Sequence, residues 1–325
     1  ILIFGIFFVL SNQIAGRILV PKYGTKLVMS LAFPLITFST LLSIISSSYF
    51  YFLLTFIPAG IGWGASGPIG GIHCQLIEKH FKKIITPYYA MGFNIGILVG
   101  GGLAGIIMRY SFEPFMFFLV LSFSSILVAL LVLHLGLPSN LDFKGKGEKF
   151  KIPESNVLIF GFLLFFVFGS GGIIMDWSTL WLSKDLNAPL YLASMGLIFF
   201  SIGGILANLF SNSLIDLFTE KVVGCHFVMI GASIMLLSLL TNNFYIILGV
   251  LCIYGFAIAN LVPIVIRQAV KQSNESIPMT VTNLITIGLS STMIMPAAIG
   301  FLAETFSLTL NTVSYTHLTL PTTYG

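Results

Sequence analysis

Apolar runs of about 20 residues recur along the whole chain, and they constrain its fold more than any other feature. A run of this length is what an α-helix needs to cross the hydrocarbon core of a bilayer. Only 8% of the residues are charged, whereas soluble domains carry about 25% charged residues. The mean hydropathy of +1.02 agrees with this composition. The sequence therefore predicts an integral membrane protein.

The membrane-spanning segments are predicted to be helices, because a helix satisfies its own backbone hydrogen bonds in lipid. A transmembrane β-barrel would need short segments of alternating polarity instead, and the runs do not alternate. We place ten spans, at residues 1–18, 28–47, 50–74, 84–108, 114–136, 156–182, 188–213, 222–241, 244–267 and 278–303.

Lysine and arginine residues lie on alternate loops. Of the 15 in the chain, 13 fall in the loops near 17–26, 75–83, 137–155, 214–221 and 267–277. The loops on the other side hold only Arg109 and Lys184. Because basic loops of membrane proteins face the cytoplasm, we predict a multi-pass protein of the cell (inner) membrane with these five loops inside. The net charge of +4 is explained in this way, and no nucleic-acid partner is expected.

The longest polar stretch, 137–155, separates five predicted spans from five. It is predicted to be a flexible cytoplasmic linker between an N-terminal helical half, 1–136, and a C-terminal half, 156–312. The end of the chain, 313–325, is polar and resembles a translated sequencing adapter, so we expect it not to be native. Five helices on each side then suggest two halves of six.

An internal repeat supports the two halves. The loop after the first span reads "LVPKYGTK" at 19–26, and the loop after the seventh reads "LIDLFTEK" at 214–221. Both fit the pattern L-x3-aromatic-x2-K, and they occupy equivalent places in the two halves.

The loop "GRILVPKYGTK" resembles the signature loop of the major facilitator superfamily, G-x-L-x-D-R-x-G-R-K, between its second and third helices. The likeness is carried by Arg17, Leu19, Lys22, Gly24 and Lys26. Gly24 is expected to form a tight turn, and the two lysines to meet helix ends and lipid phosphates. Pro21 stands where the family has an aspartate, so the charge-relay latch attributed to that aspartate does not transfer.

Two further stretches are similar to one branch of this superfamily, the YbjJ-type, fucose-permease-like transporters. "MDWSTLWLSKDLNAPLYLASMGLIFFSIGGILANL" looks like the seventh and eighth helices of the branch, and "PAAIGFLAETFSL" like its eleventh. The resemblance covers 1–312 and implies an all-α membrane protein with the major facilitator fold. About 10 of its 12 helices are expected here, helices 2–6 and 7–11. It implies a secondary transporter that works by alternating access, not an enzyme.

Polar side chains inside the predicted spans are few, and the main candidates for binding cargo are Asn94, Asp176, Trp177, Ser201, Asn260 and Ser290. Further polar groups that could meet cargo lie closer to the cytoplasmic ends of the spans, namely Asn12, Gln13, His73, Gln75, Asn208 and Asn212. Four of the main candidates are neutral and lie near the middle of their spans, where interhelical hydrogen bonding is the alternative role. Asp176 lies near the outer end of its span, and an acid inside a span is a functional candidate. Asp176 could equally belong, with Trp177 and Trp181, to an interfacial belt.

The predicted cargo is a small neutral or weakly polar solute, with sugars as the first candidates, because no lysine or arginine is placed at mid-depth. Drug or metabolite efflux by the same fold, or a transport-inactive sensor, are the alternatives. The sequence does not decide whether a proton is transported together with the solute. We expect a monomer in the lipid bilayer, with no cofactor and no metal, since the three cysteines are isolated and have no metal-binding spacing.

An intramembrane serine protease is a further alternative, raised by "GASG" at 64–67. Ser66 would be the nucleophile and His134 the base. Their predicted depths differ by roughly 10 Å at 1.5 Å of rise per residue. A serine–histidine pair needs hydrogen-bond reach, which disfavours this function.

Small residues four apart predict close helix packing in lipid. The fourth span has such a series in Gly92, Gly96 and Gly100. We therefore expect this span to pack tightly against a neighbouring helix at these glycines, with a gating hinge as the alternative role.

Overall fold

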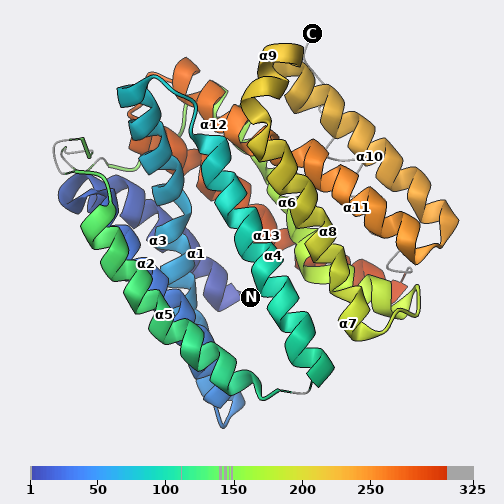
Figure 1. Ribbon diagram of the computed structural model, residues 1–325. Helices are drawn as coiled ribbons and strands as arrows, with labels where there is room; N and C mark the ends of the chain where they lie inside the picture. Colours follow the sequence, from blue (N-terminus) through green and yellow to red (C-terminus); the bar gives the residue numbers. More distant parts are fainter. Residues whose placement is uncertain are drawn as a thin grey trace. The chain divides into compact units, whose positions relative to one another are not determined.

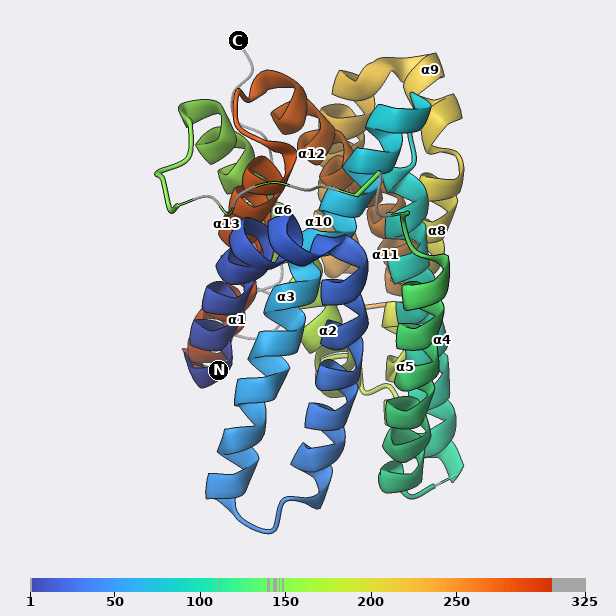
Figure 2. The same ribbon diagram turned by 90° about the vertical axis from the view of Figure 1, so that its left-hand side faces the viewer.

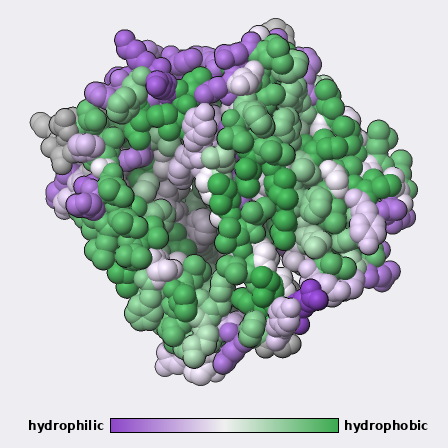
Figure 3. All heavy atoms as spheres, viewed as in Figure 1, coloured by the Kyte–Doolittle hydropathy of each residue, from purple (hydrophilic) through white to green (hydrophobic). Residues whose placement is uncertain are grey.

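The computed structural model describes residues 2–110, 112–138, 141–142, 145, 147 and 149–305, so the tail at 313–325 lies outside the described residues. All regular secondary structure in this part of the chain is helical, and eight helical segments are long and apolar enough to cross a membrane. The predicted all-α membrane fold is therefore confirmed. Hydrophobic residues cover most of the face shown in Figure 3, and hydrophilic residues gather along its upper edge.

The helices before the linker are α1 (Leu2–Ile14), the short π-helix η1 (Ala15–Leu19), α2 (Val20–Ile45), α3 (Tyr49–Phe81), α4 (Thr86–Tyr110) and α5 (Pro114–Leu135). The helices after it are α6 (Ser155–Lys184), α7 (Leu190–Ala193), α8 (Met195–Leu209), α9 (Ser211–Lys221), η2 (Val222–His226), α10 (Phe227–Ser238), η3 (Leu239–Thr241), α11 (Phe244–Ala259), α12 (Leu261–Gln272) and α13 (Ile277–Thr305).

One apolar segment is too long to be a single span. Ile3–Ile45 contains 43 residues, which would extend about 65 Å as a straight helix, twice the thickness of the hydrocarbon core. The helix breaks at Gly24, where φ is 82° and ψ is 163°. This segment therefore accounts for the first two predicted spans, and α13 accounts for the tenth.

The first compact unit consists of Ile1–Ile85, Glu113–Gly161 and Gln268–Met293. In it α3 packs against α1 and α2, and α2 also packs against α5, as Figure 2 shows. The second unit consists of Thr86–Phe112, Phe162–Arg267 and the residues described from Ile294 onward. In it α8 packs against α4 and α11, and α11 also packs against α10 (Figure 1).

These units do not coincide with the predicted halves 1–136 and 156–312. Helix α4 precedes the linker in the sequence but packs on α8 in the second unit. Helix α13 follows the linker in the sequence, but most of it belongs to the first unit. The two halves are defined by the sequence repeat and remain a prediction. The two units are defined by which helices contact one another.

The two units repeat one packing pattern with a constant offset in sequence. Gly24 has φ 82° and ψ 163°, and Thr219, which is 195 residues later, has φ 72° and ψ 156°. Ser48 caps the N-terminus of α3, and Asn243, again 195 residues later, caps that of α11. The three-helix sets α1, α3, α2 and α8, α11, α10 correspond under this offset. The structure supports the predicted internal repeat.

Glycines allow the closest helix crossings in both units. A Cβ atom built at Gly64 of α3 would overlap the backbone of Phe8 in α1, and one at Gly255 of α11 would overlap the backbone of Phe200 in α8. Each glycine therefore permits a backbone-to-backbone contact that no other residue would permit.

The expectation of tight packing at Gly92, Gly96 and Gly100 is wrong. No described heavy atom from another segment lies within 4 Å of a Cβ atom built at any of the three. All three are exposed. The spacing of small residues predicted a helix face that could be approached closely, but it did not identify a helix that approaches it.

We predict that Gly64→Leu prevents correct folding and that Gly96→Leu does not. The leucine at 64 must displace α1, and overpacking of this kind costs typically 1–3 kcal/mol or more, whereas the leucine at 96 meets open space. Expression and melting temperature of the two detergent-solubilised variants provide the measurement. Equal loss of folded protein from both would contradict this account of the crossings.

Candidate functional site

Five of the six main candidates for binding cargo belong to the second unit, and one of them marks a close helix contact. Asn94 of α4 is 9% exposed and donates from Nδ2 to the Ala90 carbonyl at 3.0 Å. Its amide lies against Gly204 of α8, where a Cβ atom would come within 2.7 Å of Asn94 Oδ1. Asn94 thus fills the space that Gly204 leaves between the two helices.

Two helices of the second unit each have an interruption of one irregular residue, Phe210 after α8 and Asn260 after α11, and helical hydrogen bonds continue past both. α8 ends at Leu209 before α9 begins, and α11 ends before Asn260 and α12. Asn260, 1% exposed, donates from Nδ2 to the carbonyl of Ala207 at 2.9 Å, which joins the two interruptions.

Several buried polar atoms on α8, on its continuation and at Asn260 lack hydrogen-bond partners in the described part of the chain. Among the described residues, no partner is present for Ser201 Oγ, either amide atom of Asn208, Ser211 Oγ or Asn260 Oδ1. We call Ser201, Asn208, Ser211 and Asn260 the interruption cluster. Ser201, Asn208 and Ser211 share one face of α8 and its continuation, at spacings of seven and three residues. Each unpaired buried group costs about 1–3 kcal/mol, so a ligand that pairs with them recovers that free energy.

Asp176 is exposed in α6, and Trp177 beside it is half-buried. Trp181, one turn further on, is only 1% exposed. The expected pair of interfacial tryptophans is therefore wrong for Trp181, because its ring is packed inside the protein.

Ser290 lies in α13 within the first unit, apart from the set above. Its hydroxyl donates to the Ile287 carbonyl at 2.6 Å, a bond within its own helix. The hydroxyl of Ser66, the protease alternative, likewise donates to Trp63 in its own helix, at 3.0 Å.

Arg17 is buried and bonded on several sides, although it was expected in an exposed basic loop. It lies in η1, is 4% exposed, and its Nε donates to Gln13 Oε1 at 2.5 Å. Its Nη2 donates to Asn283 Oδ1 of α13 at 2.7 Å, and its Nη1 to the Lys149 carbonyl of the linker at 3.0 Å. The guanidinium also lies 4.9 Å from the centroid of the Phe150 ring. Arg17 therefore joins α1, α13 and the linker.

A line of polar contacts between α1 and α13 continues from Arg17. Gln13 Nε2 donates to Thr286 Oγ1 at 2.6 Å, and that hydroxyl lies 2.8 Å from Asn12 Oδ1. On the other side, Asn283 Nδ2 donates to Glu275 Oε2 at 3.1 Å. We call Asn12, Gln13, Arg17, Asn283 and Thr286 the α1–α13 seam. It lets two apolar helices associate through hydrogen bonds, which lipid does not compete for.

The rest of the signature loop is helical, with one break. Gly24 makes the predicted sharp turn at positive φ, and Leu19 and Lys22 lie in helical segments on either side of Val20. Lys22 is exposed and its Nζ lies 5.0 Å from the Tyr23 ring centroid. The Lys26 side chain lies beside Gly136 at the end of α5, as expected for a cation near a helix C-terminus.

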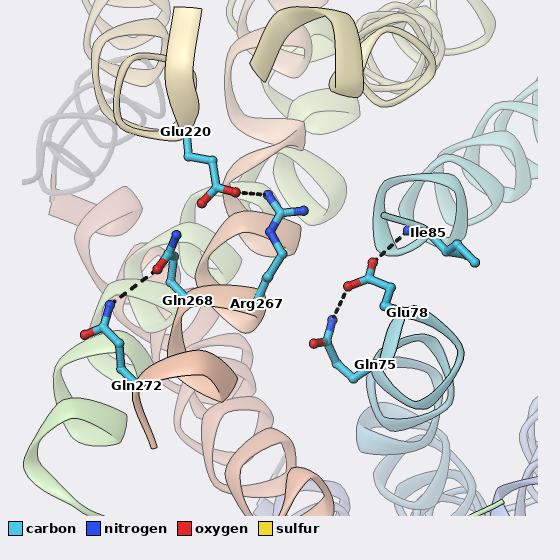
Figure 4. Close-up of polar contacts among 7 residues, drawn as sticks. All are labelled: Gln75, Glu78, Ile85, Glu220, Arg267, Gln268 and Gln272. Carbon is cyan, nitrogen blue, oxygen red and sulfur yellow. Dashed lines mark hydrogen bonds and ion pairs between the residues drawn. The ribbon is translucent and has the colours of Figure 1, made fainter. Parts of the chain in front are cut away.

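Arg267 is a buried cation that was assigned to a loop by sequence. It lies in α12, within the apolar segment Phe244–Gln272, and its side chain is 6% exposed. Its Nη2 pairs with Glu220 of α9 at 2.6 Å (Figure 4). Its Nε and Nη1 have no partner among the described residues.

Figure 4 also shows how α3 is tied to the connection that follows it. Gln75 Nε2 donates to Glu78 Oε2 at 3.1 Å, and Glu78 Oε1 accepts the backbone N–H of Ile85 at 2.7 Å. The Glu78 carboxylate therefore joins the C-terminal part of α3 to the start of the connection that follows it.

Several residues of these networks were missed by sequence reasoning, namely Glu275, Asn283, Thr286 and Glu220. Asn283 and Thr286 had a detectable signal, since they are polar residues at the sixth and ninth positions of the apolar span 278–303. The acids lie in polar loops, where their sequence neighbourhood gives no signal.

Comparison with known proteins identifies the family. The model of the Major Facilitator Superfamily matches residues 1–277. The chain belongs to this superfamily. An uncharacterized MFS-type transporter of Yersinia pestis is 25% identical over 321 residues, covering 95% of this chain and 80% of the relative. The membrane protein MosC of Rhizobium meliloti is 26% identical over 267 residues, covering 79% of this chain and 63% of its own length.

Solved structures show the same fold. The human organic anion transporter MFSD10 (TETRAN) has a TM-score of 0.71 at 15% identity, covering 98% of this chain and 81% of the transporter. The fucose:proton symporter FucP of Escherichia coli has a TM-score of 0.68 at 13% identity, covering 98% of this chain and 88% of FucP. The expected superfamily, major facilitator fold and membrane transporter class are therefore confirmed.

We predict that Arg17→Ala destabilises the protein by about 2–4 kcal/mol, because it leaves buried acceptors of α13 and the linker unpaired. Arg17→Lys should recover little, since an ammonium group cannot reproduce the fork of guanidinium donors. Melting temperatures in detergent give the measurement. Lys22→Ala, at an exposed cation five residues away, serves as the control and should stay within about 0.5 kcal/mol of wild type.

Proposed function

We propose that this protein is a secondary active transporter of a small neutral or weakly polar solute, with sugars as the first candidates. The two halves would rock around a central site and expose it alternately to each side of the membrane. The observation that carries the proposal is the interruption cluster, whose amide and hydroxyl atoms are buried and lack partners among the described residues.

The chemistry of the cluster favours hydroxyl-rich cargo. An amide offers both donors and an acceptor, and a hydroxyl offers one donor and two acceptor sites. Sugar hydroxyls have the same dual character, so each can both give and accept a hydrogen bond. Asn94 of α4 lies against Gly204 of α8, the helix that carries Ser201 and Asn208, and would extend this lining toward α4.

A second candidate cargo is a weakly acidic organic anion, moved in either direction. It is favoured by Arg267, which keeps two guanidinium nitrogens without a partner among the described residues. Against it, the charge of Arg267 is already balanced by Glu220 at 2.6 Å. Neutral cargo therefore remains the first proposal, and the same assay decides between them.

The proposed orientation places the linker and the other basic loops in the cytoplasm. It rests on the distribution of 13 of the 15 lysine and arginine residues over alternate loops. With this orientation the α1–α13 seam and the Glu220–Arg267 pair lie toward the cytoplasmic ends of their helices.

Uptake by cells that express the protein tests the function. We predict accumulation of at least one neutral sugar or polyol from a radiolabelled panel that also includes monocarboxylates. Asn208→Leu should raise the apparent KM for that solute roughly three- to tenfold while leaving the melting temperature unchanged or higher, because replacing an unpaired buried amide by an apolar isostere is neutral or stabilising.

The matched control is Ser213→Ala, at an exposed hydroxyl of α9, which should leave uptake unchanged. Accumulation of monocarboxylates alone would favour the second candidate. Uptake that is insensitive to both Asn208→Leu and Ser201→Ala would remove the interruption cluster from the cargo site.

We further propose that Asp176 orients cargo or gates its entry at the extracellular mouth, with Trp177 beside it. Gly169, Gly171 and Gly172 precede it in α6, and no described atom of another segment lies within 4 Å of a Cβ atom built at Gly171. This part of the helix can therefore rotate or bend with little steric hindrance. Related sequences of the branch often have a glutamate where this chain has Gly171, so proton coupling through that position is not part of the proposal.

Asp176→Asn should slow uptake on the order of tenfold at normal surface expression, since hydrogen bonds to a charged group contribute about 1.5–3 kcal/mol. The initial uptake rate is the measurement. Glu113→Gln removes another exposed carboxylate and should have no effect. Unchanged uptake in Asp176→Asn would leave Asp176 as a residue of the membrane interface.

A further inference from the structure

The linker supplies a carboxylate to the helix that begins after the break at Gly24. The backbone N–H of Thr25 donates to Asp142 Oδ2 at 2.8 Å, and the Thr25 hydroxyl donates to Asp142 Oδ1 at 3.1 Å. A Cβ atom at Gly24 would overlap the Asp142 carboxylate. Asp142 therefore acts as an N-terminal cap for α2 beyond the break, although the two residues are 117 positions apart.

The contact continues from α2 into α3. Thr25 is fully buried, and its Oγ1 lies 2.9 Å from Nδ1 of His73. The hydroxyl has one proton and can accept as well as donate. When it donates to Asp142, it accepts from a protonated Nδ1 of His73. A continuous polar chain thus runs from the linker through α2 to α3.

At the equivalent position of the second unit, the carboxylate belongs to the residue that follows the break and does not come from the linker. Glu220 follows the break at Thr219 as Thr25 follows the break at Gly24, and the two residues are again 195 positions apart. Glu220 of α9 pairs with Arg267 of α12 at 2.6 Å. In the first unit the corresponding residue is a threonine, and no carboxylate is present in the loop "LVPKYGTK".

We propose that Asp142 is a positioning residue of the transport cycle, which restores from the linker the carboxylate that the N-terminal half lacks in its own loop. The Asp142–Thr25–His73 contact would then be a latch that holds the linker, α2 and α3 together when the cytoplasmic end is closed. This inference rests on the proposed function. It gives the linker a part in closure, whereas the sequence predicted only a flexible connection.

Other contacts show that the linker is seated along the same junction. The N–H of Gly145 donates to the Pro21 carbonyl at 3.3 Å, and Arg17 donates to the Lys149 carbonyl. Charge-assisted hydrogen bonds are about twice as strong as neutral ones, so the Asp142 contact should contribute most to this seating. Release of Asp142 would free the linker and the N-terminal end of α2 together.

Cys74 provides a reporter that requires no cargo. It is 4% exposed and adjoins His73, while the other two cysteines, Cys225 and Cys252, can be replaced by serine. In this background we expect Asp142→Ala to raise the rate of Cys74 alkylation by N-ethylmaleimide about tenfold, the factor expected for loss of a charged hydrogen bond. Asp142→Asn, which keeps one acceptor oxygen, should give an intermediate rate.

Trypsin digestion of the linker gives a second, independent readout. Asp142→Ala should speed cleavage at the linker lysines in inside-out vesicles, whereas trypsin outside intact cells should not cleave it. Glu113→Gln is the control for loss of a carboxylate and should change neither rate. Unchanged Cys74 alkylation and linker cleavage in Asp142→Ala, at normal expression, would overturn the latch. So would a lower melting temperature without faster alkylation, which indicates a structural contact only.

A double-mutant cycle with Thr25→Val tests whether the two residues act together. Valine removes the hydroxyl but keeps the shape and the backbone N–H, so the double variant should resemble Asp142→Ala alone. Additive effects on Cys74 alkylation would show that the Thr25 hydroxyl and Asp142 act independently, and would also overturn the continuous contact from Asp142 through Thr25 to His73. Because alkylation is measured without cargo, failure of the uptake assay would refute the proposed function and leave this result unaffected.

Discussion

Pairing of polar groups in an apolar solvent is the constraint on which the rest of this structure depends. Backbone groups are paired by making the described chain almost entirely helical, and helix ends are capped by single residues such as Ser48 and Asn243. Buried side chains follow the same constraint. Arg17 would be very costly alone in this environment, and its acceptors come from two helices and the linker. The few polar residues thus determine which apolar helices associate.

Sequence reasoning predicted what depends on local pattern. The spans follow from the length and polarity of each run, and the turn at Gly24 follows from the loop motif. The repeat was detected from three matching positions, and the shared backbone conformation of Gly24 and Thr219 supports it. The pairings Arg17–Asn283 and Thr25–Asp142 join residues 266 and 117 positions apart. No local pattern carries them, because a polar residue in a sequence does not specify which distant residue will satisfy it.

The glycines illustrate the same limit. Gly96 has the spacing of a packed helix face and meets open space, while Gly64 and Gly255 make the close crossings. A small residue permits an approach, but the approach occurs only where a partner helix is brought there by the rest of the fold. The cargo candidates behave similarly, since Asn94 is explained by Gly204 opposite it and Ser290 by a bond in its own helix.

The two breaks after the first helix of each set show how one backbone geometry is maintained by different chemistry. Gly24 adopts positive φ without strain, whereas Thr219 adopts nearly the same angles at a cost of about 1–3 kcal/mol for a residue with a side chain. That strain must be offset by its surroundings, and Glu220 follows immediately with an ion pair to a buried arginine. At Gly24 there is no strain to offset, and the loop carries no acid. There the carboxylate comes from the linker, so it is held only as long as the linker is seated. Under the proposed function, this difference makes the closure of the N-terminal half depend on the segment that connects the halves, while that of the C-terminal half depends on residues within it.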